Sequence, residues 1–220
     1  MEICICPDAA EVGRMSAALV AKVSREAVGD PVLGVATGSS PLGTYAELAR
    51  LVAAGNLDLT RAYAFALDEY VGLPLGHPQS YAEIIRATVT EPLRMNPARV
   101  RTPNGFAADV EAAATDYERM IAAAGGVDIQ ILGVGSNGHI GFNEPSSSLA
   151  SRTRIKTLTA RTRQDNARFF ASLDNVPRHC LTQGLGTIMD ARNVVLVAVG
   201  EGKAHAVAAV AEGPVSSMMP

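Results

Sequence analysis

Residues 127–145 read VDIQILGVGSNGHIGFNEP and join a mostly apolar run to a glycine-rich polar loop. A strand that is apolar on both faces is typical of a parallel sheet covered by helices on each side. Ligands of such sheets bind beyond the carboxyl ends of the strands, where loops like this one lie. The stretch therefore predicts a buried strand of an α/β domain that ends in a functional loop.

The same alternation of apolar runs and helical segments extends through the chain. Strands are expected at residues 2–6, 31–37, 62–68, 127–135 and 193–200, and helices at 7–27, 41–55, 80–93, 108–125, 161–173 and 203–213. The pairs Asp8/Glu11 and Ser80/Glu83 have the spacing of helix N-terminal caps. The pattern predicts a single domain over residues 1–220, with a mostly parallel sheet and helices on both faces.

Composition and charge argue against several classes of protein. The formal net charge is −3, so the overall charge favours neither nucleic acid nor an anionic membrane as a partner. No apolar run approaches the roughly 20 residues of a membrane span, and the first ten residues lack the layout of a signal peptide. The three cysteines lack CxxC spacing, which favours a reducing compartment. Cys4 and Cys6 are expected as core thiols of the first strand, and the chain as a cytoplasmic protein without a metal.

Gly133, Gly135 and Gly138 have the spacing of a dinucleotide-binding turn, but their context argues against one. Such a turn leads directly into a helix and is followed by an acidic residue about twenty positions later. Here Gly141 and Pro145 interrupt any helix, and position 158 is Leu. The glycines are interpreted as places where the backbone bends sharply or approaches a ligand closely. No nucleotide cofactor is expected.

Polar residues also follow the second predicted strand, directly before a helix. They are Thr37, Gly38, Ser39 and Ser40. The N–H groups and dipole of a helix N-terminus attract anions, so this loop is a candidate anion site. The alternative is an ordinary helix cap made by the hydroxyls.

Asp68 and Glu69 are adjacent carboxylates at the end of another predicted strand. Neighbouring side chains of a strand point to opposite faces, so one of the two is expected to face the ligand. A carboxylate beside a ligand carbonyl is suited to removing a proton from the neighbouring carbon. The alternative is a helix cap or a surface acid.

His139 is the natural acid–base group of the glycine-rich loop, with Asn137, Asn143 and Glu144 near it in the sequence. Glu144 is close enough through a tight loop to orient the imidazole or to exchange a proton with it. A structural histidine is the alternative, but the polar surroundings favour a functional role.

Several cations lie in the second half of the chain. Arg152, Arg154 and Lys156 share one face of the segment SRTRIKT if it is extended. This segment is interpreted either as a solvated strand edge or as a second anion site. Arg168 and Lys203 are isolated cations, which are either surface residues or ligands of a phosphate.

Together these segments resemble a known family. The motifs, in chain order, are TGSSPLGTY, LDEYVGLP, HPQSY, GVGSNGHIGFNEP, SRTRIKTLT, DNARFF and VAVGEGKAHAV. Their order and spacing over nearly the whole chain resemble the glucosamine-6-phosphate deaminases, and LDEYVGLP with GHIGFNEP is specific. The resemblance implies a modified Rossmann-like α/β fold that carries no nucleotide cofactor.

The resemblance also implies a reaction, the conversion of glucosamine 6-phosphate and water to fructose 6-phosphate and ammonia. By this similarity His139 moves a proton at the ring oxygen to open the sugar, and Glu144 supports His139. Asp68 then moves a proton between C2 and C1. The implied phosphate-binding residues are Thr37, Gly38, Ser39, Ser40, Arg168 and Lys203.

Two features depart from the family pattern. Asn137 stands where some members have Asp. An amide cannot carry a proton, so Asn137 is expected to orient His139 while any relay runs through Glu144. The chain stops at EGPVSSMMP, where the family pattern usually continues, so a C-terminal segment is expected to be missing.

The resemblance further implies a homo-oligomer regulated by N-acetylglucosamine 6-phosphate. In the allosteric members, which are hexamers, this ligand binds at a subunit interface. The matching residues here are Ser147, Arg154 and Lys156. The expected ligands are therefore a small sugar phosphate as substrate and a second one as effector.

Two other functions stay open. A 6-phosphogluconolactonase shares the fold but needs no carboxylate-driven proton transfer between C1 and C2. Replacing Asp68 by Asn should therefore affect it less. A non-catalytic sugar-phosphate sensor would have little reason to keep Asp68 together with His139 and Glu144, and no helix-turn-helix fits before the first predicted strand.

Overall fold

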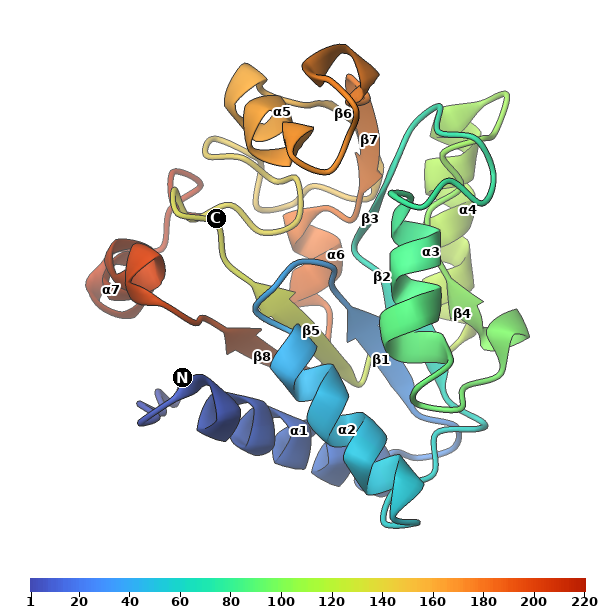
Figure 1. Cartoon of the computed structure of the whole chain (residues 1–220), viewed down its shortest axis with the longest axis vertical. Helices are drawn as coiled ribbons and strands as arrows, with labels where there is room; N and C mark the ends of the chain where they lie inside the picture. The colour runs from blue at the N-terminus through green and yellow to red at the C-terminus, as the bar shows by residue number, and fades with distance from the viewer.

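The computed structural model describes residues 1–220, apart from the side chain of Asp165, the first residue of DNARFF. Its centre is a five-stranded parallel sheet with the strand order β4-β2-β1-β5-β8. The strands are β1 (Val32–Val35), β2 (Tyr63–Ala66), β4 (Val100–Arg101), β5 (Ile129–Gly133) and β8 (Asn193–Val197). The predicted α/β fold with a mostly parallel sheet is confirmed (Figure 1).

Helices cover both faces of this sheet. They are α1 (Ala9–Glu26), α2 (Leu42–Ala53), α3 (Tyr81–Ile85), α4 (Val110–Ala123), α6 (Leu185–Met189) and α7 (Ala204–Glu212). A further helix, α5 (Ala160–Ala167), lies outside these layers. A π-helical turn, η1 (Arg86–Thr90), continues α3, and shorter 3-10 turns are η2 (Pro97–Arg99), η3 (Leu173–Asn175) and η4 (Glu201–Lys203).

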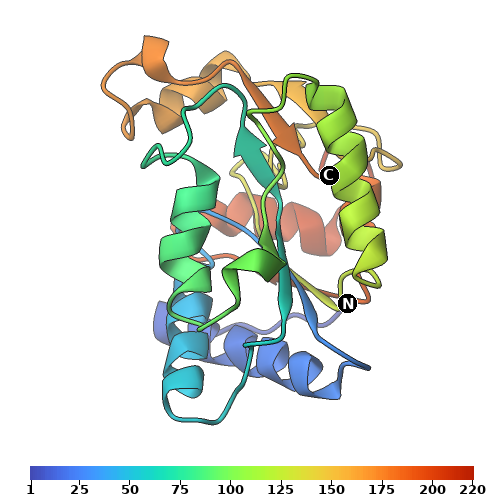
Figure 2. The same cartoon turned by 90° about the vertical axis from the view of Figure 1, so that its right-hand side faces the viewer.

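The side chains of β1 alternate between two helical layers. Leu33 and Val35 pack into a core built with α1, α2, α3 and η1, whereas Val32 packs against Tyr117 and Ile121 of α4. Figure 2 accordingly shows α3 and α4 on opposite sides of the strands. Both faces of β1 are buried, which explains why it reads as a continuous apolar run.

Both predicted helix caps are confirmed. The Asp8 carboxylate accepts the N–H of Glu11 at 2.7 Å and starts α1. The Ser80 hydroxyl accepts the N–H of Glu83 at 3.3 Å and starts α3. Each bond satisfies an N–H that has no partner within its helix.

The structure also contains a small antiparallel sheet, with the strand order β3-β7-β6, that the sequence pattern did not predict as a sheet. Its strands are β3 (Asp68–Tyr70), β6 (Arg154–Thr157) and β7 (His179–Thr182). These strands are too short to show a clear alternation of apolar and polar residues. Figure 1 shows the small sheet and α5 beyond the carboxyl ends of the large sheet.

The prediction of a first strand at residues 2–6 is wrong. These residues form neither a strand nor a bridge. A strand needs a neighbour for its backbone, and within the described chain no segment pairs with this one. Cys4 is exposed and Cys6 is only half-buried, with its Sγ atom 3.5 Å from the sulfur of Met15. The expectation that both thiols lie in the core is therefore also wrong.

None of the described helices is both long and apolar enough to span a membrane. The last residues of the chain lie beside the loop that follows β5 (Figure 1). The Ser146 N–H donates to the carbonyl oxygen of Ser217 at 2.7 Å.

Candidate active site

Three loops of the candidate site follow neighbouring strands of the large sheet. The order β1-β5-β8 places the ends of these strands side by side, and they lead into residues 37–40, 134–145 and 198–203. A Cβ atom on Gly133 would lie 3.9 Å from the Cβ atom of Ser40. The TGSS loop and the glycine-rich loop therefore meet where parallel sheets bind their ligands.

Asp68, the first residue of β3, lies where the two sheets meet. It pairs with Thr182 of β7 in the antiparallel ladder and is only 5% exposed. A Cβ atom on Gly141 would lie 3.2 Å from the Asp68 Oδ2 atom, so the glycine-rich loop passes directly over this carboxyl. Burial, helped by the neighbouring charge of Glu69, raises the pKa of Asp68 to about 8. A carboxyl group with such a pKa is suited to proton transfer near neutral pH.

Glu69 is engaged elsewhere. Its Oε1 atom accepts the N–H groups of Tyr70 at 2.8 Å and Tyr81 at 2.9 Å, and Oε2 accepts that of Ala82 at 2.8 Å. Tyr81 and Ala82 begin α3, so Glu69 satisfies N–H groups that the helix leaves without partners. The adjacent carboxylates therefore separate as predicted: Glu69 caps α3, and Asp68 faces Gly141.

Asn137, His139 and Glu144 form a hydrogen-bonded group within the glycine-rich loop. Asn137 Nδ2 donates to Glu144 Oε2 at 2.9 Å, and Asn137 Oδ1 lies 2.7 Å from His139 Nδ1. A carboxylate can only accept, which orients the amide and turns its oxygen towards the imidazole. The proton is therefore assigned to Nδ1, and the lone pair of the neutral ring to Nε2. Glu144 Oε2 lies 3.8 Å from Nδ1, beyond hydrogen-bond distance, so Asn137 stands between the two groups and the predicted direct contact of Glu144 with the imidazole is not formed.

Gly135 makes room for the His139 ring. A Cβ atom on Gly135 would lie 2.3 Å from the Nδ1 and Cε1 atoms of that ring. The Gly135 N–H also donates to the carbonyl oxygen of His139 at 2.8 Å. This is the close backbone approach expected of the glycines in this loop.

Residues distant in the sequence complete this framework. The Thr162 hydroxyl of α5 donates to Glu144 Oε1 at 2.7 Å. The Thr182 hydroxyl accepts the Phe142 N–H at 3.3 Å. No local sequence pattern connects either threonine with the glycine-rich loop, so neither could be predicted as part of the site. Only the fold brings them to it.

The TGSS loop leads into α2 without a cap from the described side chains. Gly38 has φ +99°, which strongly favours glycine, and α2 begins four residues later. At the start of α2 no hydrogen bond from a described side chain caps the helix. The alternative reading of this loop as an ordinary hydroxyl cap is therefore not supported, and the N–H groups at the start of α2 remain suited to an anion.

The predicted phosphate cations lie on two further elements. Arg168 follows the last residue of α5, with its guanidinium 4.7 Å from the centre of the Phe169 ring. Lys203 is half-buried at the end of η4, in the segment that follows β8. Because β8 is the neighbour of β5 and parallel to it, Lys203 and the glycine-rich loop follow the carboxyl ends of adjacent strands.

The residues predicted for a second anion site lie near this loop. Arg154 of β6 donates to the Asn143 side-chain oxygen at 2.8 Å and to the Arg152 carbonyl at 3.3 Å, and neither partner is a carboxylate. Burial lowers the pKa of Arg154. The Ser147 hydroxyl is buried and has no hydrogen-bond partner among the described residues. Lys156 is half-buried on the same strand.

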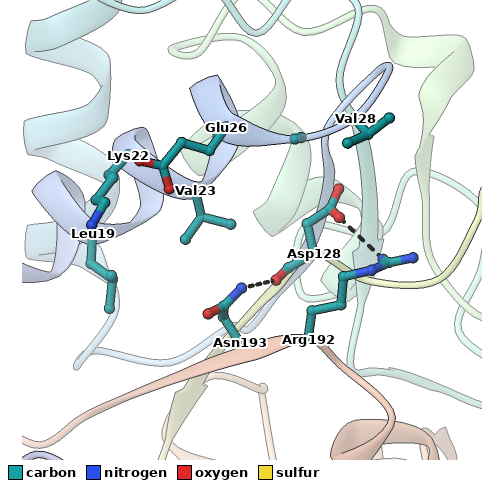
Figure 3. Close-up of a pocket in the computed structure, with 9 residues that line it drawn as sticks. Leu19, Lys22, Val23, Glu26, Val28, Asp128, Arg192 and Asn193 are labelled. Carbon is teal, nitrogen blue, oxygen red and sulfur yellow. Dashed lines mark hydrogen bonds and ion pairs between the residues drawn. The ribbon is translucent and has the colours of Figure 1, made fainter.

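Two cavities lie away from these loops. Figure 3 shows one of about 320 Å³ between α1 and the starts of β5 and β8, where Arg192 contacts Asp128 at 3.1 Å. The other, about 610 Å³, lies between α4 and α6 and is lined by Glu118 and Thr187. The first is at the amino ends of the strands and contains no predicted site residue, and of the residues predicted for a second anion site only Arg152 lines the other. Within the described chain no three His, Cys, Asp or Glu side chains are placed to hold a metal.

The chain is similar in sequence to known proteins along its whole length. Residues 7–220 match the family described as glucosamine-6-phosphate isomerases/6-phosphogluconolactonase. A glucosamine-6-phosphate deaminase from Cutibacterium acnes is 61% identical over 220 residues, which are all of this chain and 84% of the relative. The enzyme of the same name from Streptomyces coelicolor is 54% identical, with coverage of 100% and 84%.

Solved structures give the same comparison in three dimensions. A structure described as a monomeric glucosamine-6-phosphate deaminase superposes with a TM-score of 0.95 at 41% identity and covers 100% of this chain and 91% of its own. The 6-phosphogluconolactonase from Thermotoga maritima superposes with a TM-score of 0.72 at 17% identity, covering 94% and 88%. At that identity the second comparison shows a common fold alone.

Proposed function

Because the chain belongs to the glucosamine-6-phosphate isomerase/6-phosphogluconolactonase family, we propose that it converts glucosamine 6-phosphate and water to fructose 6-phosphate and ammonia. Relatives that are 53–61% identical over the whole chain carry the name of this deaminase. The observation that favours it over lactone hydrolysis is the buried Asp68 carboxyl under Gly141, with a pKa near 8. Lactone hydrolysis needs no base for a carbon-bound proton.

Asp68 performs the isomerisation. In the open-chain substrate its carboxylate removes the proton from C2, and the electron pair of the C–H bond forms a C1–C2 double bond as the aldehyde oxygen takes up a proton. The same carboxyl returns its proton to C1. The double bond then lies between C2 and nitrogen, and water adds to C2 as ammonia leaves. One base of matched pKa serves both proton transfers.

His139 opens the ring before this step. Neutral imidazole has its lone pair on Nε2 when Nδ1 donates to Asn137, so Nε2 takes the proton of the C1 hydroxyl and delivers it to the ring oxygen. Glu144, hydrogen-bonded to Asn137 and Thr162, stabilises the positive charge that forms on the ring. Asn137 itself carries no proton and keeps His139 in one tautomer.

The phosphate of the substrate is held at the start of α2. The N–H groups of Gly38, Ser39 and Ser40, with the hydroxyls of Thr37 and the two serines, surround the anion. Arg168 and Lys203 neutralise its charge. Support comes from the start of α2, which no described side chain caps, and from the strand order, which puts the TGSS loop and Lys203 at the same end of the large sheet.

The test measures ammonia and fructose 6-phosphate released from glucosamine 6-phosphate, with 6-phosphogluconolactone as the rival substrate. Equimolar release of both products, lost in Asp68→Asn and in His139→Gln, is the expected result. Hydrolysis of the lactone that survives Asp68→Asn would instead identify a lactonase. Binding of glucosamine 6-phosphate without turnover would identify a sensor.

A second sugar-phosphate site is proposed at Ser147, Arg154 and Lys156, with N-acetylglucosamine 6-phosphate as its ligand. Support comes from the Arg154 guanidinium, whose partners are uncharged, and from the buried Ser147 hydroxyl. Titrating this ligand into the rate assay tests the site, and unchanged half-saturation and cooperativity would exclude it. The homo-oligomer stays a prediction, and the solved relative at 41% identity is described as monomeric. Analytical ultracentrifugation would distinguish the two states.

A further inference from the structure

Glu69 lies beside the proposed base but on the other side of β3, and it is almost completely buried, with 1% of its surface exposed. Its carboxylate accepts three backbone N–H groups, from Tyr70 on its own strand and from Tyr81 and Ala82 at the start of α3. β3 is a three-residue edge strand of the small sheet. The carboxylate therefore attaches this short strand to a helix of the main core.

We propose that Glu69 is a positioning residue of the reaction, which fixes the direction of the Asp68 side chain and places a carboxylate next to it. Adjacent strand residues point to opposite faces, so Glu69, once bonded to α3, leaves Asp68 one direction, towards Gly141. This inference rests on the proposed role of Asp68 as the base.

The charge of Glu69 matters because the tyrosine and cysteine side chains buried around Asp68 are uncharged. These groups come from β3, α3, α4 and β7, and burial is the main cause that raises the pKa of each: Tyr70, Tyr81, Tyr117 and Cys180. The cation Arg154 lies on β6, in register with Thr182 of β7, and its guanidinium donates to the Asn143 side chain. Within the described chain, Glu69 is the charged neighbour that opposes ionisation of Asp68.

The charge on Glu69 itself is favoured by its three donors. Burial raises the pKa of Glu69, and the N–H groups of Tyr81, Ala82 and Tyr70 oppose that rise. A carboxylate with several N–H donors keeps its charge far more readily than one without them, and a helix N-terminus adds to the effect. Asp68 has no such donors among the described residues, so the hydrogen bonds favour ionisation of Glu69 over that of Asp68.

The test compares the pH dependence of kcat/KM in Glu69→Gln and in a control, Ser80→Ala. Glu69→Gln removes the charge and at least one of the three bonds. The acid limb of its profile of kcat/KM against pH should move to lower pH by about one unit. Its kcat should fall about tenfold, because Asp68 is held less firmly. Ser80→Ala removes the neighbouring cap of the same helix without changing charge. It should destabilise the protein without moving the limb.

An unmoved limb in folded Glu69→Gln, or an equal movement in Ser80→Ala, overturns the proposal. If Glu69→Gln does not fold, ¹³C NMR of carboxyl-labelled wild-type protein follows both groups, with the Asp68 signal assigned through Asp68→Asn. Glu69 should ionise at lower pH than Asp68. A Glu69 that stays protonated while Asp68 titrates overturns the proposal. This titration needs no turnover, so a wild-type protein that forms no product would contradict the proposed function separately.

Discussion

The Oδ2 atom of Asp68 lies 3.2 Å from the point that a Cβ atom on Gly141 would occupy, and the Thr182 hydroxyl lies 3.1 Å from the same point. Gly141 has φ +59°, so the backbone itself favours glycine. A methyl group there would enter the space over the proposed base. We predict that Gly141→Ala lowers kcat for ammonia release by about a hundredfold, because small displacements of reacting groups cost that much.

Gly55→Ala is the matched control for this substitution. Gly55 has φ +71° and no atom within 4 Å of its hypothetical Cβ, and it follows the end of α2. Both variants should lose about 1 kcal/mol of unfolding free energy through the left-handed backbone alone. Only Gly141→Ala should lose activity. Equal kinetic losses in the two variants would show that strain, rather than contact with Asp68, is responsible.

The raised pKa of Asp68 predicts how the rate depends on pH. A base must be ionised to accept the C2 proton, and burial together with the Glu69 charge raises the pKa of Asp68 to about 8. kcat/KM should therefore rise with pH through a midpoint near 8, since this parameter reports the free enzyme. A titration of the substrate's amino group, done in parallel, corrects for its own ionisation. A rate that is constant from about pH 5 to 9 would contradict this assignment.

The same pKa makes a prediction for stability. The Asp68 carboxyl titrates near 8 in the folded protein and near 3.9 in an unfolded chain, so the folded state holds the proton more tightly. This contribution to stability is present below about pH 4 and is lost as the pH rises to about 8. Asp68→Asn removes the titration. Its unfolding free energy should exceed that of the wild type at pH 8 by more than about 1.4 kcal/mol, the value of one pKa unit.

Urea unfolding at several pH values measures this difference, which should grow from pH 5 to pH 8. Asp128→Asn is a suitable control, because Asp128 is a partly exposed carboxylate bonded to Arg192 at the other end of the sheet. Its substitution should not increase stability. A difference for Asp68→Asn that shrinks as the pH rises would contradict a raised pKa.

The strands β1, β2 and β5 could be predicted because they are largely buried on both faces and therefore read as apolar runs. β8 was predicted from its apolar run although its first two residues are exposed, and β4, with only two residues, was not predicted. Helix starts could be predicted at Asp8 and Ser80, because a cap is a local interaction over three residues. Residues 2–6 show the limit of such patterns, since alternation alone cannot supply a strand with a neighbour. β3 and β7 have strand neighbours but no clear apolar pattern over their three and four residues, so they were not predicted.

The candidate site also contains contacts that are local in the sequence and contacts that only the fold creates. His139, Asn137 and Glu144 lie within eight positions of one another, so their hydrogen bonds could be anticipated from a tight loop. The sequence could also indicate that Asp68 and Glu69 separate, but not which of them faces the loop. That choice depends on where α3 begins. The contributions of Thr162 and Thr182 depend on contacts across 18 and 40 positions, which only the folded chain creates.

Asn137 offers a last test of the imidazole's orientation. Its amide oxygen receives the Nδ1 proton of His139, and its NH₂ group donates to Glu144. Asn137→Ala removes both contacts, so the imidazole is no longer confined to the tautomer with its lone pair on Nε2. We predict that kcat falls by about 10- to 100-fold, because a catalytic group that is out of place by about 1 Å can cost that much. KM should change little, because the proposed phosphate contacts remain.

Thr162→Val is the control for Asn137→Ala. It removes the hydroxyl that donates to the other oxygen of Glu144 but leaves the Asn137–His139 contact in place. Its loss of kcat should be smaller, since the tautomer of His139 is unaffected. Steady-state rates of ammonia release for the two variants, with circular dichroism to verify folding, decide the matter. Full activity of Asn137→Ala would show that His139 needs no orienting partner, and a larger loss in Thr162→Val would assign that role to Glu144.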